Sequence, residues 1–190
     1  MSKYLLASLN SFFIILFAYF VFLSIISWQE SMELINPEKI SIKIGSYLYL
    51  PLGAYVFCWI IYGNQGLPGQ LLISLLMSIY WSLDYNILVQ FSLINVIAPI
   101  LATSIFRELA IYKFKDFKSE TVLAILFLCI VLALFNSLSK FFFYFLTENH
   151  ESNPFVFLTT YLPGDIIGAF VFIMFAKFIM KTFHLGSYRT

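Results

Sequence analysis

Two ionisable side chains, Lys140 and Asp165, lie inside long apolar runs of the sequence. A charged group within the membrane is costly, so it usually faces a protein interior, pairs with an opposite charge or lines a path for a ligand or ion. Lys140 lies near the end of one apolar run and Asp165 near the start of the next. We expect both near the outer surface on adjacent helices, as a fold-locking ion pair, as separately solvated groups, or as a ligand or ion site.

The stretch "YLPGDIIGAF" (Tyr161–Phe170) places proline and glycine directly before Asp165. Proline is favoured at the first position of a helix, and a carboxylate is favoured in the first turn. The stretch therefore predicts that the last helix begins within two or three residues of Pro163 rather than at Phe155. It also predicts that Asp165 faces the bundle and has a hydrogen-bonding partner, of which Lys140 is the favoured one.

Other polar or small residues in the apolar runs suggest helix-to-helix contacts. Asn95 and Asn136 are further candidates for a ligand or ion-pair site, although bonds between helices, worth roughly 1 kcal/mol each or less, are the simpler role. Gly164 and Gly168 form a GxxxG pattern, which is typical of a close-packing helix face. Tyr49 lies near a predicted membrane interface, where aromatic rings are enriched as anchors.

The composition explains why these few polar residues stand out. Of the 190 residues, 61% are hydrophobic, 20% are aromatic and only 11% are charged, whereas soluble domains carry roughly 25% charged residues. Such a chain is suited to a bilayer. The net charge of +1 gives no argument for binding nucleic acid. We expect an all-α, polytopic transmembrane helix bundle that forms one integral membrane domain over residues 1–190.

A membrane span needs about 20 mostly apolar residues, and six stretches approach this length. The third is the shortest, so it and the fourth are also compatible with a helical hairpin that does not fully cross. The predicted spans are 5–27, 44–62, 70–83, 87–106, 121–146 and 162–183.

The distribution of lysine and arginine predicts the orientation, because these residues concentrate in cytoplasmic loops. With a cytoplasmic N-terminus, only Lys39 and Lys43 fall outside. Both termini are then cytoplasmic, and we expect a multi-pass protein of a bacterial-type inner membrane. The basic residues placed on the cytoplasmic side are Lys3, Arg107, Lys113, Lys115, Lys118, Lys177, Lys181 and Arg189.

Motifs of common catalytic sites are missing from the sequence. It contains no Walker A pattern, no HExxH and no GxSxG, whose residues bind phosphates, hold zinc or supply a nucleophile. Cys58 and Cys129 both lie in apolar runs, and the sequence has no Cys/His cluster of metal-site spacing. We therefore expect no enzyme, no cofactor and no metal.

Three short patches resemble the bacterial membrane-associated sensor domains found ahead of signalling enzymes. These patches are "YLPLGAYVFCWIIYGNQGLPG" (Tyr49–Gly69), "ATSIFRE" (Ala102–Glu108) and "GDIIG" (Gly164–Gly168). A further patch, "LPGDIIGAFVFIMFAKFI" (Leu162–Ile179), resembles the substrate-binding component of energy-coupling-factor vitamin transporters. The first resemblance implies a sensor-like protein, and the second implies a small-molecule ligand.

These observations predict a non-catalytic, sensor-like or accessory subunit of a larger membrane complex. The alternative is a small-molecule, vitamin-type binding subunit of a membrane transporter. Besides the lipid bilayer, we expect another membrane protein as the partner, because the apolar spans offer more contact area than the short loops. The polar linker at Arg107–Glu120 is expected to lie along the cytoplasmic interface or to provide a docking surface.

Overall fold

The computed structural model describes residues 2–35, 48–80, 85–108, 122–146 and 154–182, and every element within them is helical. The protein is all-α. A 3-10 turn, η2 (Gly63–Gln65), joins the second and third helices. The helices are α1 (Lys3–Ile35), α2 (Leu50–Tyr62), α3 (Leu67–Tyr80), α4 (Tyr85–Glu108), α5 (Val122–Leu146) and α6 (Pro154–Thr182).

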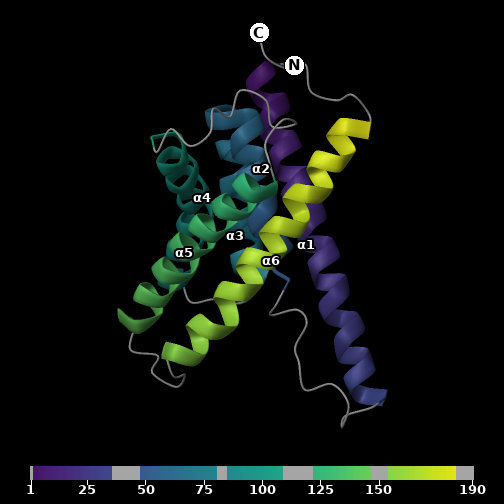
Figure 1. Cartoon of the computed structure of the whole chain (residues 1–190), viewed down its shortest axis with the longest axis vertical. Coiled ribbons are helices and arrows are strands. Elements are labelled where there is room, and N and C mark those ends of the chain that lie inside the picture. The colour runs from purple at the N-terminus through teal and green to yellow at the C-terminus, as the bar shows by residue number, and fades with distance from the viewer. Residues whose placement is uncertain (1, 36–47, 81–84, 109–121, 147–153, 183–190) are drawn as a thin grey trace.

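Three described segments are long and apolar enough to cross a bilayer: Lys3–Trp28 of α1, Val122–Phe142 of α5 and Tyr161–Thr182 of α6. Two shorter apolar helices accompany them, at Leu67–Tyr80 and Ser92–Ile105. The first turn of α1 and the last turn of α6 lie at the same end of the molecule (Figure 1). This architecture fits a multi-pass membrane helix bundle.

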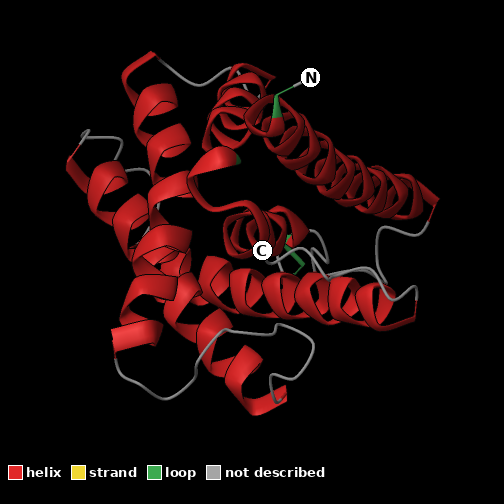
Figure 2. Cartoon of the chain, turned by 90° about the horizontal axis from the view of Figure 1, so that it is seen from above, coloured by secondary structure: helices red, strands yellow, loops and turns green. Residues whose placement is uncertain are grey.

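Helix α2 lies in the middle of the bundle and contacts α1, α4 and α6. It has 13 residues, nearly all of them apolar, and a helix that is apolar on every face is a buried one. Seven consecutive residues, Leu50–Val56, are buried. Leu52 and Val56 pack with side chains of α4, α5 and α6, whereas Tyr55 and Cys58 pack with α1, α3 and α4. The other helices are inclined around this centre rather than parallel (Figure 2).

Small residues allow α2 and α6 to approach each other closely. A Cβ atom at Gly53 of α2 would lie only 2.7 Å from the carbonyl oxygen of Ala169 on α6. A Cβ atom at Gly168 would overlap the backbone of Tyr49, the residue just before α2. Because lipid provides no hydrophobic drive between helices, such close backbone packing is a main source of their association.

The predicted start of the last helix is wrong. Helix α6 begins at Pro154, so Pro163 lies in its interior. Pro154 provides the favoured first-turn proline instead. An interior proline removes one backbone bond, whereas the continuous helix pairs the other backbone groups of the segment before Pro163. The continuous helix is therefore the better arrangement.

The other helices differ from the predicted spans mainly at their ends. Helix α1 continues to Ile35, eight residues beyond the predicted 27. Helix α2 begins at Leu50 rather than at residue 44, because Pro51 occupies its first turn, where a missing N–H has no cost. Helices α4 and α5 begin and end within two residues of the predicted limits. Residues 44–47, 81–83, 121 and 183 of the predicted spans lie outside the described part.

Candidate functional site

The carboxylate of Asp165 on α6 is enclosed by protein, with 3% of the residue exposed. Its Oδ2 atom accepts hydrogen bonds from the Asn136 side-chain amide at 2.7 Å and from the Ser137 hydroxyl at 2.9 Å, both on α5. Bonds to an ionised acceptor are stronger than bonds between neutral groups. Asp165 thus faces the bundle with two partners on the neighbouring helix.

Lys140 lies one helical turn after Asn136, so the two side chains share a face of α5. The Lys140 amine lies over the ring of Tyr49, 5.2 Å from its centroid, a distance at which a cation is attracted to the negative face of an aromatic ring. The charges of Lys140 and Asp165 also attract each other. The structure therefore brings Asp165, Asn136 and Lys140 together, and adds Tyr49 and Ser137 to them.

Tyr49 links this group to α1, α2 and α6. Its backbone N–H donates to the carbonyl of Gly164 at 3.1 Å, and its hydroxyl shares a hydrogen bond with the Tyr19 hydroxyl at 3.0 Å. Its ring also meets the ring of Phe22 edge-on. The interfacial position predicted for Tyr49 stays a prediction; in the bundle its ring packs against those of Tyr19 and Phe22. The positive end of the α2 dipole therefore lies beside Gly164, one residue before Asp165.

We define the polar junction as Tyr49, Asn136, Ser137, Lys140 and Asp165. It contains one carboxylate and one ammonium group, so its formal charges cancel. The Oδ1 atom of Asn136 is buried and has no hydrogen-bond partner among the described residues. The junction is thus suited to fixing the positions of the helices. It could also bind a polar group that donates a hydrogen bond to the Asn136 Oδ1 atom.

Asn95 does not belong to the polar junction. It lies on α4, where its side-chain amide donates to the Ser74 hydroxyl of α3 at 3.2 Å. Of the two glycines predicted as a packing face, Gly168 lies against the Tyr49 backbone and Gly164 accepts the Tyr49 N–H.

Sequence reasoning missed Ser137 and the tyrosine pair formed by Tyr19 and Tyr49. A signal for Ser137 was present, because Asn136, Ser137 and Lys140 fall within five residues of an otherwise apolar run. No comparable signal identified the tyrosines, since their residue type is common throughout this sequence.

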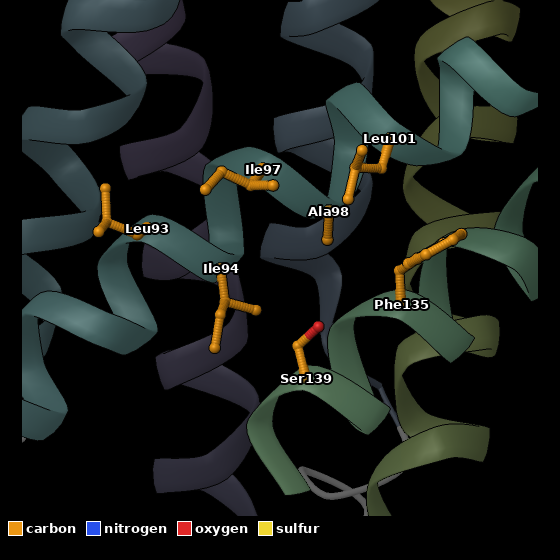
Figure 3. A pocket seen from close by; sticks show the side chains of 7 residues that line it. All are labelled: Leu93, Ile94, Ile97, Ala98, Leu101, Phe135 and Ser139. Carbon is orange, nitrogen blue, oxygen red and sulfur yellow. The ribbon is translucent and has the colours of Figure 1, made fainter. Parts of the chain in front are cut away.

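A groove of about 240 Å³ lies between α4 and α5. Figure 3 shows apolar side chains around it, with the hydroxyl of Ser139 as the polar exception. Leu93, Ile97 and Leu101 are each more than 40% exposed, as expected for side chains that contact lipid tails. The groove lining contains no residue of the polar junction. It consists of Leu93, Ile94, Ile97, Ala98, Leu101, Phe135 and Ser139.

Comparison with known proteins gives no relative from which a function could be transferred. No protein-family model, no curated protein sequence and no solved structure matches this chain.

Proposed function

We propose that this chain is a non-catalytic, sensor-like or accessory subunit of a larger membrane complex. In this proposal it crosses a bacterial-type inner membrane six times, with both termini in the cytoplasm. The observation that carries the proposal is the burial of three members of the polar junction: Asp165, Asn136 and Ser137 are each at most 3% exposed.

A charge-containing junction whose carboxylate is buried suits a protein that holds one arrangement of its helices or transmits a change in it. The Asp165 carboxylate already has two donors from α5, and Tyr49 ties the start of α2 to α6 and α1. A change in the position of one helix would thus alter bonds at the others. Coupling of this kind requires an element with two arrangements whose balance a signal can shift, and a partner in the membrane plane would supply that signal.

The alternative is a small-molecule binding subunit of a membrane transporter. One observation favours it, namely the buried Oδ1 atom of Asn136 that lacks a described partner. A ligand with an N–H or O–H group could donate to this oxygen while the junction supplies charges of both signs. The resemblance of Leu162–Ile179 to vitamin-binding components agrees with this alternative.

Isolation in a mild detergent, followed by mass measurement of the native particle, distinguishes the two functions. A sensor-like or accessory subunit should be recovered in an assembly well above the 22.0 kDa of the chain, without an energy-coupling ATPase. Recovery of one 22.0 kDa chain carrying a bound metabolite would contradict the proposal and favour the transporter alternative.

Reporter fusions test the proposed topology. Fusions after Lys118 and after Thr190 should report the cytoplasm, because basic residues concentrate on that side. Fusions near Pro37 and His150 should report the outside. The measurement is the activity of a reporter pair with opposite compartment requirements, and an outside signal at Thr190 would rule out six crossings.

A further inference from the structure

Helix α3 carries a buried polar stripe that the polar junction does not include. Gln70, Ser74 and Ser78 occupy positions i, i+4 and i+8, so they lie on one face of the helix over about 12 Å. Gln70 and Ser74 are fully buried, and Ser78 is 5% exposed. The stripe faces the interior, since Leu72, Leu75 and Leu76 on the other faces are exposed.

At one end of this stripe, the α3 side chains form hydrogen bonds with residues of α4. The Ser74 hydroxyl donates to the Ser92 carbonyl at 3.3 Å and accepts from the Asn95 amide at 3.2 Å. The Ser78 and Ser92 hydroxyls are 3.0 Å apart. Side-chain hydrogen bonds of this type hold helices together in lipid. Contact between α3 and α4 therefore explains the polar residues at this end.

Other polar atoms around α3 have no such bonds. Four residues carry buried polar atoms without a hydrogen-bond partner among the described residues: the Ser11 hydroxyl, the Tyr55 hydroxyl, both side-chain polar atoms of Gln70 and the Oδ1 atom of Asn95. Ser11, Tyr55 and Gln70 are fully buried. Buried polar groups in folded proteins almost always have a partner, whether protein or ordered water.

These four side chains are connected through two points on and beside α3, Gly66 and Ser74. Ser11 and Gln70 both flank Gly66, because a Cβ atom there would overlap the Ser11 hydroxyl and lie 3.3 Å from the Gln70 amide nitrogen. Ser74 lies one turn after Gln70 and is bonded to Asn95. The Tyr55 hydroxyl lies near those of Ser74 and Tyr19. The four residues come from α1, α2, α3 and α4, and the two α3 residues at these points, Gln70 and Ser74, are one turn apart.

We propose that Ser11, Tyr55, Gln70 and Asn95 line a second, uncharged site that holds a small neutral molecule with both hydrogen-bond donors and acceptors. The lining requires this chemistry, because the Gln70 amide nitrogen can only donate and the Asn95 and Gln70 amide oxygens can only accept. A charged guest is disfavoured, since none of these four side chains carries a charge to compensate it. Water and a small polar solute share the required chemistry.

Apolar replacements of nearly equal shape test whether the site is occupied. If a guest is bonded there, Gln70→Met and Tyr55→Phe should each lower the melting temperature in detergent, because the guest loses a partner. If these atoms are unbonded, both replacements should raise it, because a buried group without a partner is removed. Ser11→Ala removes one oxygen only and should also lower the melting temperature if a guest is bonded there, so it remains informative if Gln70→Met fails to fold.

Two control variants calibrate this measurement. Tyr4→Phe removes the hydroxyl of a residue that is 66% exposed and should leave the melting temperature unchanged. Tyr19→Phe removes a hydroxyl that bonds to Tyr49 at 3.0 Å and should lower it. An unchanged or higher melting temperature in both Tyr55→Phe and Gln70→Met would overturn the proposal.

The identity of the guest is then read from the wild-type protein. Bound water gives infrared O–H bands that shift when the protein is transferred to water labelled with oxygen-18, and these bands should weaken in Gln70→Met. A polar solute gives no such shift but adds mass to the native particle that Gln70→Met lacks. Either signature supports the site, and the absence of both overturns it.

Discussion

Replacement of Asp165 by alanine should lower the free energy of unfolding by about 3–5 kcal/mol, the usual cost of breaking a buried charge pair from one side. The loss has two sources. The Asn136 amide and the Ser137 hydroxyl, which donate to Asp165 at 2.7 and 2.9 Å, would be left without their acceptor. The Lys140 ammonium group would also lose the opposite charge that attracts it.

The measurement is thermal or denaturant unfolding in detergent for a double-mutant cycle. Asp165→Asn keeps an oxygen acceptor and should lose less stability than Asp165→Ala. Combined with Lys140→Met, Asp165→Asn should lose less than the sum of the two single variants, because the pair is then removed together. Additive losses across the cycle would show that the two charges do not act as a pair.

Gly168→Ala should destabilise the protein by about 1–3 kcal/mol, the range for added methyl groups in tightly packed cores. Helix propensity alone predicts the opposite sign, since alanine is favoured over glycine by about 1 kcal/mol inside a helix. The structure reverses this expectation because the added Cβ would overlap the Tyr49 backbone. Backbone at this position cannot swing away as a flexible side chain could, so α2 and α6 must separate.

Unfolding of the purified variant in detergent checks this prediction. Gly53→Ala is a second test of the same contact, because its Cβ would lie 2.7 Å from the Ala169 carbonyl oxygen. Val171→Leu, at a residue of α6 that is 43% exposed, is the control and should have little effect. A Gly168→Ala variant more stable than wild type would mean that α2 and α6 are not in close contact.

Tyr49 takes part both in the polar junction and in the close contact between α2 and α6. Its backbone contacts Gly164 and Gly168, and its ring lies beneath the Lys140 amine. Separation of α2 from α6 should therefore also disturb the charged side of the polar junction. This connection is the structural reason to treat the helix crossing and the polar junction as one unit in the proposed function.

Several features could be predicted from the sequence because they depend on local composition. The scarcity of charge and the lengths of the apolar runs indicated a membrane helix bundle, and three long apolar helices agree with it. The limits of α4 and α5 were predicted within two residues. The ends of a hydrophobic run can be read from the sequence, because they depend only on whether neighbouring residues are apolar or polar.

The partners of Asp165 were decided only by the tertiary structure. The sequence favoured Lys140, which stays a prediction as a hydrogen-bonding partner; the structure shows hydrogen bonds from Asn136 and Ser137, 29 and 28 residues away. Which residue of α5 faces Asp165 depends on how far the two helices slide and rotate against each other, and no local pattern carries that information. The start of α6 was also decided only by the structure, because the sequence offers prolines at both 154 and 163 as first-turn residues, and the helix begins at the earlier one.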